Sequence, residues 1–272
     1  MNNYVSKLPE EILNHIGGDA NDVASAEAFP IHSYRDLVTI TAKVAYMNKN
    51  NLLFYRGQAT DYKGQKASKS TFYPTIYRGH LSKQAIQDRF RLLDEASQLL
   101  KQEFVENDLE DSLEVKKRKY VRWSILQHYG VCGTPFLDFT HSLRVACSFA
   151  MDSEENKTDE AFIYLFGLPY LTNRITTNSE QDIVNVRLLG ICPSIALRPH
   201  FQQGYVASTD EVTYEYDRKS DLDFNRRLIA KFKIPNNKSF WGAGFDPIPR
   251  PSLYPGGDEV ETICERIKNQ LK

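Results

Sequence analysis

Residues 52–58 read Leu-Leu-Phe-Tyr-Arg-Gly-Gln, a short apolar run that stops at Arg56 and Gly57. Four apolar residues bounded by polar ones predict a buried strand over Leu52–Tyr55. The strand would end at a guanidinium and at a glycine, whose bare backbone lets a ligand approach closely. An arginine in that position can hold a phosphate through two parallel hydrogen bonds, or it can pair with a carboxylate at the strand end. The short motif alone leaves both interpretations open.

A second group of polar residues lies in core-like sequence further along the chain. Residues 123–130 read WSILQHYG and residues 134–140 read TPFLDFT, which places His128 at a helix end and Asp138 inside an apolar run. Thr140 directly precedes a third predicted helix. Buried polar groups need partners, so these three side chains either form a site or serve the fold. In the second case Asp138 or Thr140 caps the following helix, and His128 bonds to the backbone.

The spacing of apolar residues, together with capping and turn residues, predicts the remaining helices and strands. Serine caps followed by apolar residues three to four apart predict helices starting at Ser33, Ser82 and Ser142. Further helices are expected over 115–129 and 258–271, and strands over 161–169 and 228–234. Helices dominate the middle of the chain and strands are distributed along it. The pattern therefore favours an α+β fold over a regular alternation of strands and helices.

Length and composition restrict the number of domains and the kinds of protein that the sequence can encode. The 272 residues suit one large domain with an extension, and we expect a helical N-terminal segment over 1–50 packed on a catalytic domain over 51–272. The longest apolar stretch, Ala161–Leu171, is shorter than the ~20 residues that span a bilayer. The four cysteines are far apart and form no C-x-x-C pair, which is typical of reduced core thiols. We therefore expect a cytoplasmic protein without a membrane partner.

Several kinds of chemistry have no signature in the sequence. There is no phosphate loop of P-loop type, no G-x-G-x-x-G turn, no H-E-x-x-H helix and no G-x-S-x-G elbow. The six histidines do not cluster, and we predict no metal site. With 34 basic and 35 acidic side chains, the formal net charge of -1 provides no global attraction to nucleic acid.

One local stretch is strongly basic and could contact a nucleic-acid backbone or an acidic partner. A solvated helix face is the plainer interpretation of the same run. Its positive side chains are Lys116, Lys117, Arg118, Lys119 and Arg122.

Taken together, these blocks resemble the FRG domain, a bacterial family named for a phenylalanine, arginine and glycine motif. FYRGQ over 54–58 supplies the first block, and LQHYGVCGTPFLDFT with ACSFA over 126–150 resembles the second. Weaker similarities are Arg198 with the segment Gln203-Gly204-Tyr205, and KFKIP over 231–235 with Leu253-Tyr254-Pro255. The resemblance covers roughly residues 50 to 265.

FRG domains have in turn been related to the ADP-ribosyltransferase fold, and members occur in toxin and phage-defence settings. The resemblance implies a split mixed β-sheet with helical insertions that holds NAD in a cleft. It gives catalytic roles to Arg56, Asp138 and Gln203, the last where such transferases usually carry a glutamate. Remaining acids in that half of the chain are Glu211, Glu215, Asp258 and Glu259. The residues expected to contact NAD are Arg56, Gly57, Gln58, His128, Thr140 and Tyr205.

The leading hypothesis is an NAD-dependent ADP-ribosyltransferase that acts as an intracellular toxin or phage-defence effector. Its acceptor would be a protein, RNA or DNA, and a neutralising antitoxin is a further expected partner. Cleavage of the bond between ribose and nicotinamide develops positive charge on the sugar, which a carboxylate such as Asp138 would stabilise. The alternative is a non-catalytic module in which the buried polar residues are structural and the basic face binds nucleic acid or protein.

Overall fold

The structure is a computed structural model that describes residues 6–20, 22–64, 68–79, 81–152, 158–209, 216 and 218–272. The chain forms two compact units that alternate along the sequence. Unit 1 comprises Met1–Phe72, Phe139–Tyr170 and Asp223–Arg250, and unit 2 comprises Tyr73–Asp138, Leu171–Leu222 and Pro251–Lys272. The first segment of unit 1 extends to Phe72, and the domain boundary that we expected at residue 50 stays a prediction.

Unit 1 is built on a mixed sheet. Its strands follow the order β1-β8-β4-β2-β3, and only the β1–β8 pair is parallel. The strand bounds are β1 Phe29–Pro30, β2 Leu52–Gln58, β3 Leu137–Thr140, β4 Glu160–Leu168 and β8 Leu228–Pro235. The first two residues of β3 belong to unit 2 and the last two to unit 1.

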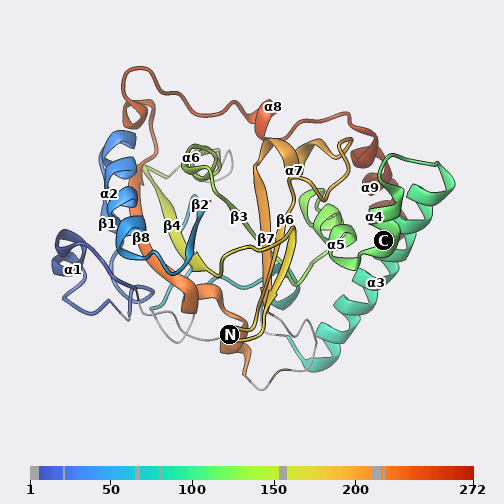
Figure 1. Ribbon diagram of the computed structural model, residues 1–272, viewed down its shortest axis with the longest axis horizontal. Coiled ribbons are helices and arrows are strands. Elements are labelled where there is room, and N and C mark those ends of the chain that lie inside the picture. Colours follow the sequence, from blue (N-terminus) through green and yellow to red (C-terminus); the bar gives the residue numbers. More distant parts are fainter. Residues whose placement is uncertain are drawn as a thin grey trace. The chain divides into compact units, whose positions relative to one another are not determined.

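The helices of unit 1 are α1 Glu10–His15, α2 Tyr34–Met47 and α6 Leu143–Met151, with the short 3-10 turns η3 Phe224–Arg227 and η4 Lys238–Trp241. Helix α6 packs against β2 and β4 (Figure 1). The tyrosine hydroxyl of Tyr55 in β2 bonds to Thr41 of α2. Both helices therefore cover the same face of β2, which we call the helix face.

Unit 2 combines a helical group with an antiparallel three-stranded sheet. Helix α3 Lys83–Glu106 runs beside α4 Ser112–Lys117, α5 Lys119–His128 and α9 Glu259–Gln270 (Figure 1). The strands are β7 Gly204–Thr209, β6 Ile183–Arg187 and β5 Ile175–Asn178, in that order. Helix α7 Leu197–Phe201 precedes β7, and η1 Thr75–Tyr77 and η2 Lys219–Leu222 are single 3-10 turns. Helix α8 Arg250–Leu253 begins at the last residue of unit 1.

The α+β class is confirmed, since helices and a mixed sheet both occur among the described residues. The expected helix starts are also confirmed, because the hydroxyls of Ser33, Ser82 and Ser142 accept hydrogen bonds from the third residue beyond each cap. The single helix expected over 115–129 is wrong. Extended backbone at Arg118 separates α4 from α5.

No helix in the described part of the chain is long and apolar enough to cross a membrane. The four cysteines carry no disulfide. Cys147, Cys192 and Cys264 are buried and Cys132 is half-buried, and burial raises the pKa of Cys132 and of Cys192 to about 12. These thiols therefore stay protonated near neutral pH.

Candidate functional site

Strand β2 carries Arg56 in its interior, not at its end. The expected end at Arg56 is wrong, because β2 continues to Gln58 and pairs with β4 over all seven of its residues. Side chains alternate along a strand, so Phe54, Arg56 and Gln58 lie opposite the helix face that holds Tyr55 and Gly57. We call this second side the Arg56 face.

Cross-strand pairing places Arg56 in a polar row. Arg56 opposes Tyr164 of β4, and Tyr164 opposes Lys231 of β8. Directly opposed residues of antiparallel strands share a face, so all three side chains lie on the Arg56 face. Arg56 itself is half-buried.

Asp61 accepts hydrogen bonds from two residues of this row, Tyr164 and Lys231. The Tyr164 hydroxyl donates to Asp61 Oδ1 at 3.0 Å, and Lys231 Nζ donates to Asp61 Oδ2 at 3.4 Å. Lys231 Nζ also donates to Ser70 Oγ at 2.9 Å and to the Ala24 carbonyl at 3.2 Å. Burial lowers the pKa of Lys231, and the carboxylate of Asp61 opposes that shift. The ammonium thus uses its three donors inside unit 1.

Gly57 lies on the helix face, where α6 passes very close to the strand. A Cβ added at Gly57 would lie 1.8 Å from the backbone oxygen of Ala146. The missing side chain therefore serves the packing of α6 on β2. We had expected the glycine to open its backbone to NAD, but the position that a side chain would occupy is filled by α6.

Thr140 lies on the helix face as well. It opposes Tyr55, the neighbour of Arg56, and is therefore on the other side of the sheet from Arg56. Thr140 is buried, and its hydroxyl accepts a hydrogen bond from the Ser142 amide at 3.1 Å. This is the structural alternative left open by the sequence, in which Thr140 stabilises the start of α6.

In unit 2, three side chains from the second block converge. Gln127 Nε2 donates to Asp138 Oδ2 at 3.0 Å, and His128 Nε2 lies 3.7 Å from Asp138 Oδ1. The His128 side chain is 5% exposed, whereas that of Asp138 is 41% exposed. Asp138 is thus partly exposed, but the two atoms that face each other, Asp138 Oδ1 and His128 Nε2, are both buried. Burial lowers the pKa of His128, the Asp138 carboxylate opposes this, and the ring is neutral at pH 7.

The Gln202-Gln203-Gly204 turn contributes to this cluster through residues that the sequence did not single out. Gln202 is buried, and its Oε1 lies 3.0 Å from His128 Nδ1. Gln203 is exposed at a positive φ of 47°, which is the conformation of a turn residue. Gly204 leaves room for the imidazole, since a Cβ there would lie 3.3 Å from His128 Cε1. Tyr205 is half-buried and opposes Arg187 of β6.

A second set of polar contacts in unit 2 involves Tyr129, which follows His128 in the chain. Arg198 forms an ion pair with Glu261, and its guanidinium lies 4.8 Å from the centre of the Tyr129 ring. The Tyr129 hydroxyl donates to Asp258 Oδ2 at 2.6 Å, and Asp258 Oδ1 accepts from the Glu261 amide at 2.7 Å. Asp258 is therefore a helix cap and a buried hydrogen-bond acceptor. Of the other acids considered, Glu211 and Glu215 lie outside the described residues, and Glu259 is exposed in α9.

Four of the five basic side chains in the stretch are exposed, but the assignment of Arg122 to a partner-binding surface is wrong. Arg122 is 8% exposed and donates to Ser97 Oγ at 2.7 Å and to the Val115 carbonyl at 2.6 Å. Arg118 pairs with Glu114 four residues earlier. Lys119 lies over the rings of Tyr120 and Trp123. Lys116, Lys117, Arg118 and Lys119 are exposed, so this surface carries one positive charge fewer than the sequence suggests, and the charge of Arg118 is paired with Glu114.

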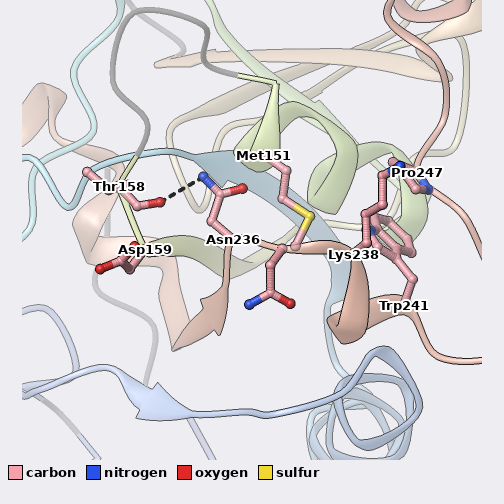
Figure 2. A pocket seen from close by; sticks show the side chains of 8 residues that line it. Met151, Thr158, Asp159, Asn236, Lys238, Trp241 and Pro247 are labelled. Atoms are coloured by element: carbon pink, nitrogen blue, oxygen red, sulfur yellow. Dashed lines mark hydrogen bonds between the residues drawn. The ribbon is translucent and has the colours of Figure 1, made fainter.

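Figure 2 shows a surface pocket of unit 1 with a volume of about 370 Å³. Asn236 Nδ2 donates to the Thr158 carbonyl at its rim. None of the predicted site residues lines this pocket. Its lining residues are Met151, Thr158, Asp159, Asn236, Asn237, Lys238, Trp241 and Pro247.

The geometry therefore defines an α+β protein with two polar clusters, one around Arg56 in unit 1 and one around Asp138 in unit 2. The sequence model of the FRG domain matches residues 53–159, which include both Arg56 and Asp138. The similarity to the FRG domain that we inferred from the sequence is confirmed over these residues. Comparison with curated proteins gives no match, and neither does comparison with solved structures.

Proposed function

We propose that this protein is an NAD-dependent ADP-ribosyltransferase that acts as a toxin or phage-defence effector. The observation that carries the proposal is the state of Asp138, a partly exposed carboxylate oriented by Gln127 and backed by a buried, neutral His128. A fixed negative charge at such a position stabilises a sugar cation without reorganising when the charge develops.

The donors and acceptors available suit the parts of NAD. The Arg56 guanidinium can hold a pyrophosphate oxygen pair through parallel hydrogen bonds, and the Gln58 amide can bond to a ribose hydroxyl. Arg56 lies in a row whose neighbours, Tyr164 and Lys231, are held by Asp61, so the strand positions around it are rigid. NAD itself supplies the scissile bond between ribose and nicotinamide.

The role of Asp138 in the reaction follows from charge. As the bond from C1′ of the ribose to nicotinamide breaks, its electron pair leaves with nicotinamide and the ribose becomes oxocarbenium-like. Ionised Asp138 stabilises that cation, as a carboxylate does in glycoside cleavage. Gln127 holds Oδ2 and so limits rotation of the carboxylate.

The test is an assay of nicotinamide release and of label transfer from adenylate-labelled NAD to a cell lysate. We expect Asp138→Asn, which keeps the shape and removes the charge, to lower both rates about 10²- to 10³-fold. Asp88→Asn is the matched control, because it makes the same change at an exposed position on α3 of the same unit. Absence of both activities from the unaltered protein would overturn the proposal, as would equal rates in the two asparagine variants.

The proposed role of Arg56 is tested by a separate measurement, the KM for NAD. We expect Arg56→Ala to raise the KM for NAD, and Arg56→Lys to restore it only in part, because an ammonium cannot form the paired hydrogen bonds. An unchanged KM in Arg56→Ala would remove Arg56 from the proposed site.

A further inference from the structure

The pocket shown in Figure 2 lies on the helix face of unit 1. Met151, which lines it, is the last residue of α6. Trp241, which also lines it, has its ring 5.1 Å from that of Tyr34 in α2. Both helices cover the helix face, so the pocket is on the other side of the sheet from Arg56. Its volume of about 370 Å³ lies within the range of roughly 300–1,000 Å³ that is usual for small-molecule sites.

The walls of the pocket are held by packing and by main-chain hydrogen bonds. Besides Tyr34, the Trp241 ring contacts Phe240 at 5.7 Å between centroids, and Trp241 is only 3% exposed. The Asn236 amide N–H donates to the Asp159 carbonyl at 2.8 Å, which joins the segments before β4 and after β8. A pocket with such walls is formed before any ligand binds, so little conformational entropy is lost on binding.

Two neighbouring asparagines present opposite polar atoms to this pocket. Asn236 Nδ2 donates to the Thr158 carbonyl at 3.0 Å, so its Oδ1 is left as an acceptor (Figure 2). Asn237 Oδ1 accepts from the Ser239 amide at 3.0 Å, so its Nδ2 is left as a donor. Neither free atom has another partner among the described residues. The complement of one acceptor and one donor is an amide group, which has an N–H and a C=O.

One charge of each sign is present among the described lining residues. Figure 2 shows Asp159 with Thr158 at one end of the pocket, Lys238 with Trp241 at the other end, and Met151 between them. Asp159 and Lys238 are both exposed, and neither forms an ion pair with a described residue. The ligand that matches these groups has a cation at one end, an anion at the other and an amide between them.

We propose that this pocket binds a short peptide with free ends. The peptide's terminal ammonium bonds to Asp159, its terminal carboxylate bonds to Lys238, and an apolar side chain contacts Met151. The peptide group lies between Asn236 Oδ1 and Asn237 Nδ2. This site is additional to the proposed contacts with NAD and does not depend on the transferase function.

The same groups match a nucleotide less well. A phosphate monoester carries about two negative charges at neutral pH, whereas Lys238 supplies one positive charge and Asp159 repels the phosphate. Bases bind to proteins by stacking on open aromatic faces. Trp241 offers no such face, because only 3% of it is exposed.

The first test observes Met151 directly. The chain has three methionines, Met1, Met47 and Met151, so the full-length protein labelled with ¹³C at its methionine methyl groups gives few signals. Replacement Met151→Leu identifies the Met151 signal by its loss. We expect the dipeptide alanyl-leucine at millimolar concentration to shift that signal and to leave the Met47 signal unchanged. An unmoved Met151 signal would overturn the proposal, and so would a shift produced by adenosine monophosphate but not by the dipeptide.

The second test assigns the two ends of the peptide from the affinity measured in the same titration. We expect Lys238→Met to weaken binding of alanyl-leucine roughly 10-fold and to leave the affinity for its C-terminal amide unchanged, because the amide has no carboxylate. Asp159→Asn should likewise weaken binding of alanyl-leucine but not of its N-acetyl form.

Lys43→Met is the matched control, because Lys43 is an exposed lysine of α2 in the same unit and does not line the pocket. It should leave every affinity unchanged. An unshifted Met47 signal in each variant shows that unit 1 is folded. Equal loss of affinity for the dipeptide and its amide in Lys238→Met would contradict the placement of the carboxylate and overturn the proposed orientation.

Discussion

The polar clusters of the two units differ in how far their charged groups are buried. In unit 1 the Lys231 ammonium meets three oxygen acceptors, and Asp61 receives bonds from both Lys231 and Tyr164. Both charged side chains of this pair are at most 10% exposed. In unit 2 the Asp138 side chain is 41% exposed and lies beside a buried His128 whose pKa burial lowers. A buried ion pair depends on both of its charges, whereas a partly exposed carboxylate is also stabilised by water.

The largest expected effect on stability follows removal of the buried Lys231 ammonium from unit 1. Lys231→Met leaves Asp61 as a buried charge without its counter-ion, and we expect it to lower the free energy of unfolding by roughly 3–5 kcal/mol. Denaturant titration measures the loss as a shift of the midpoint at constant slope.

Two variants check the cause. Lys233→Met is the matched control on the same strand, because Lys233 is more exposed and its ion pairs lie near the surface. It should cost at most about 1 kcal/mol. The double variant Asp61→Asn with Lys231→Met should lose less than the sum of the single changes, because no unpaired charge remains. Equal losses for Lys231→Met and Lys233→Met would contradict a structural role for the buried cluster.

A smaller effect comes from the two close approaches of glycine, one in each unit. Gly57→Ala places a methyl group against the backbone of α6, which cannot rotate away, and we expect a loss of about 3 kcal/mol. Gly204→Ala meets the side chains of Leu188 and His128 at 3.0 and 3.3 Å and the Pro199 backbone oxygen at 3.3 Å. These contacts are much longer than the 1.8 Å at Gly57, so the change should cost about 1–2 kcal/mol. The same unfolding titration ranks them, with Gly256→Ala as the control, because an added Cβ there lies in ordinary contact with the Glu261 carboxylate at 3.4 Å. The reverse order would show that the packing of α6 is looser than described.

The smallest expected effect is a pH dependence in unit 2. Folding lowers the pKa of His128, so its contribution to stability is fully present above the ordinary histidine pKa of about 6.5. That contribution is lost as the pH falls below 6.5 toward the lowered pKa of the folded state. Unfolding free energies measured at several pH values between about 7.5 and 5 should therefore fall more steeply for the unaltered protein than for His128→Gln. Parallel curves would mean that His128 is not buried in its neutral form.

The features that the sequence predicted correctly, such as the helix starts, depend on a few neighbouring residues. Ser33, Ser82 and Ser142 mark their helices because a cap acts within three residues. Strands β5, β6 and β7 were not predicted because residues such as ITTN and IVNVR mix polar and apolar side chains over four or five positions. Their existence depends on pairing with each other, which no short window contains.

The candidate site shows the same limit. Asp138 and His128 were singled out because they are polar residues in apolar surroundings, and the structure brings them together. Gln202 was missed in favour of its neighbour Gln203, because the sequence does not show which of two adjacent amides is buried. Arg122 was placed on a basic surface because composition does not reveal that Ser97 and the Val115 carbonyl receive its guanidinium.

The alternation of the units along the chain affects how the region that matches the FRG domain can be produced. Residues 53–159 contain β3 and all of β2 except Leu52, but they end before β4, which pairs with the whole of β2. They also exclude β8 and Gln202. A protein cut to those residues would expose the backbone amides and carbonyls of β2 as an open edge, and such edges recruit other chains. Recombinant work on this domain should therefore retain the flanking sequence, since the borders of the recognisable motif are not the borders of an independently folding piece.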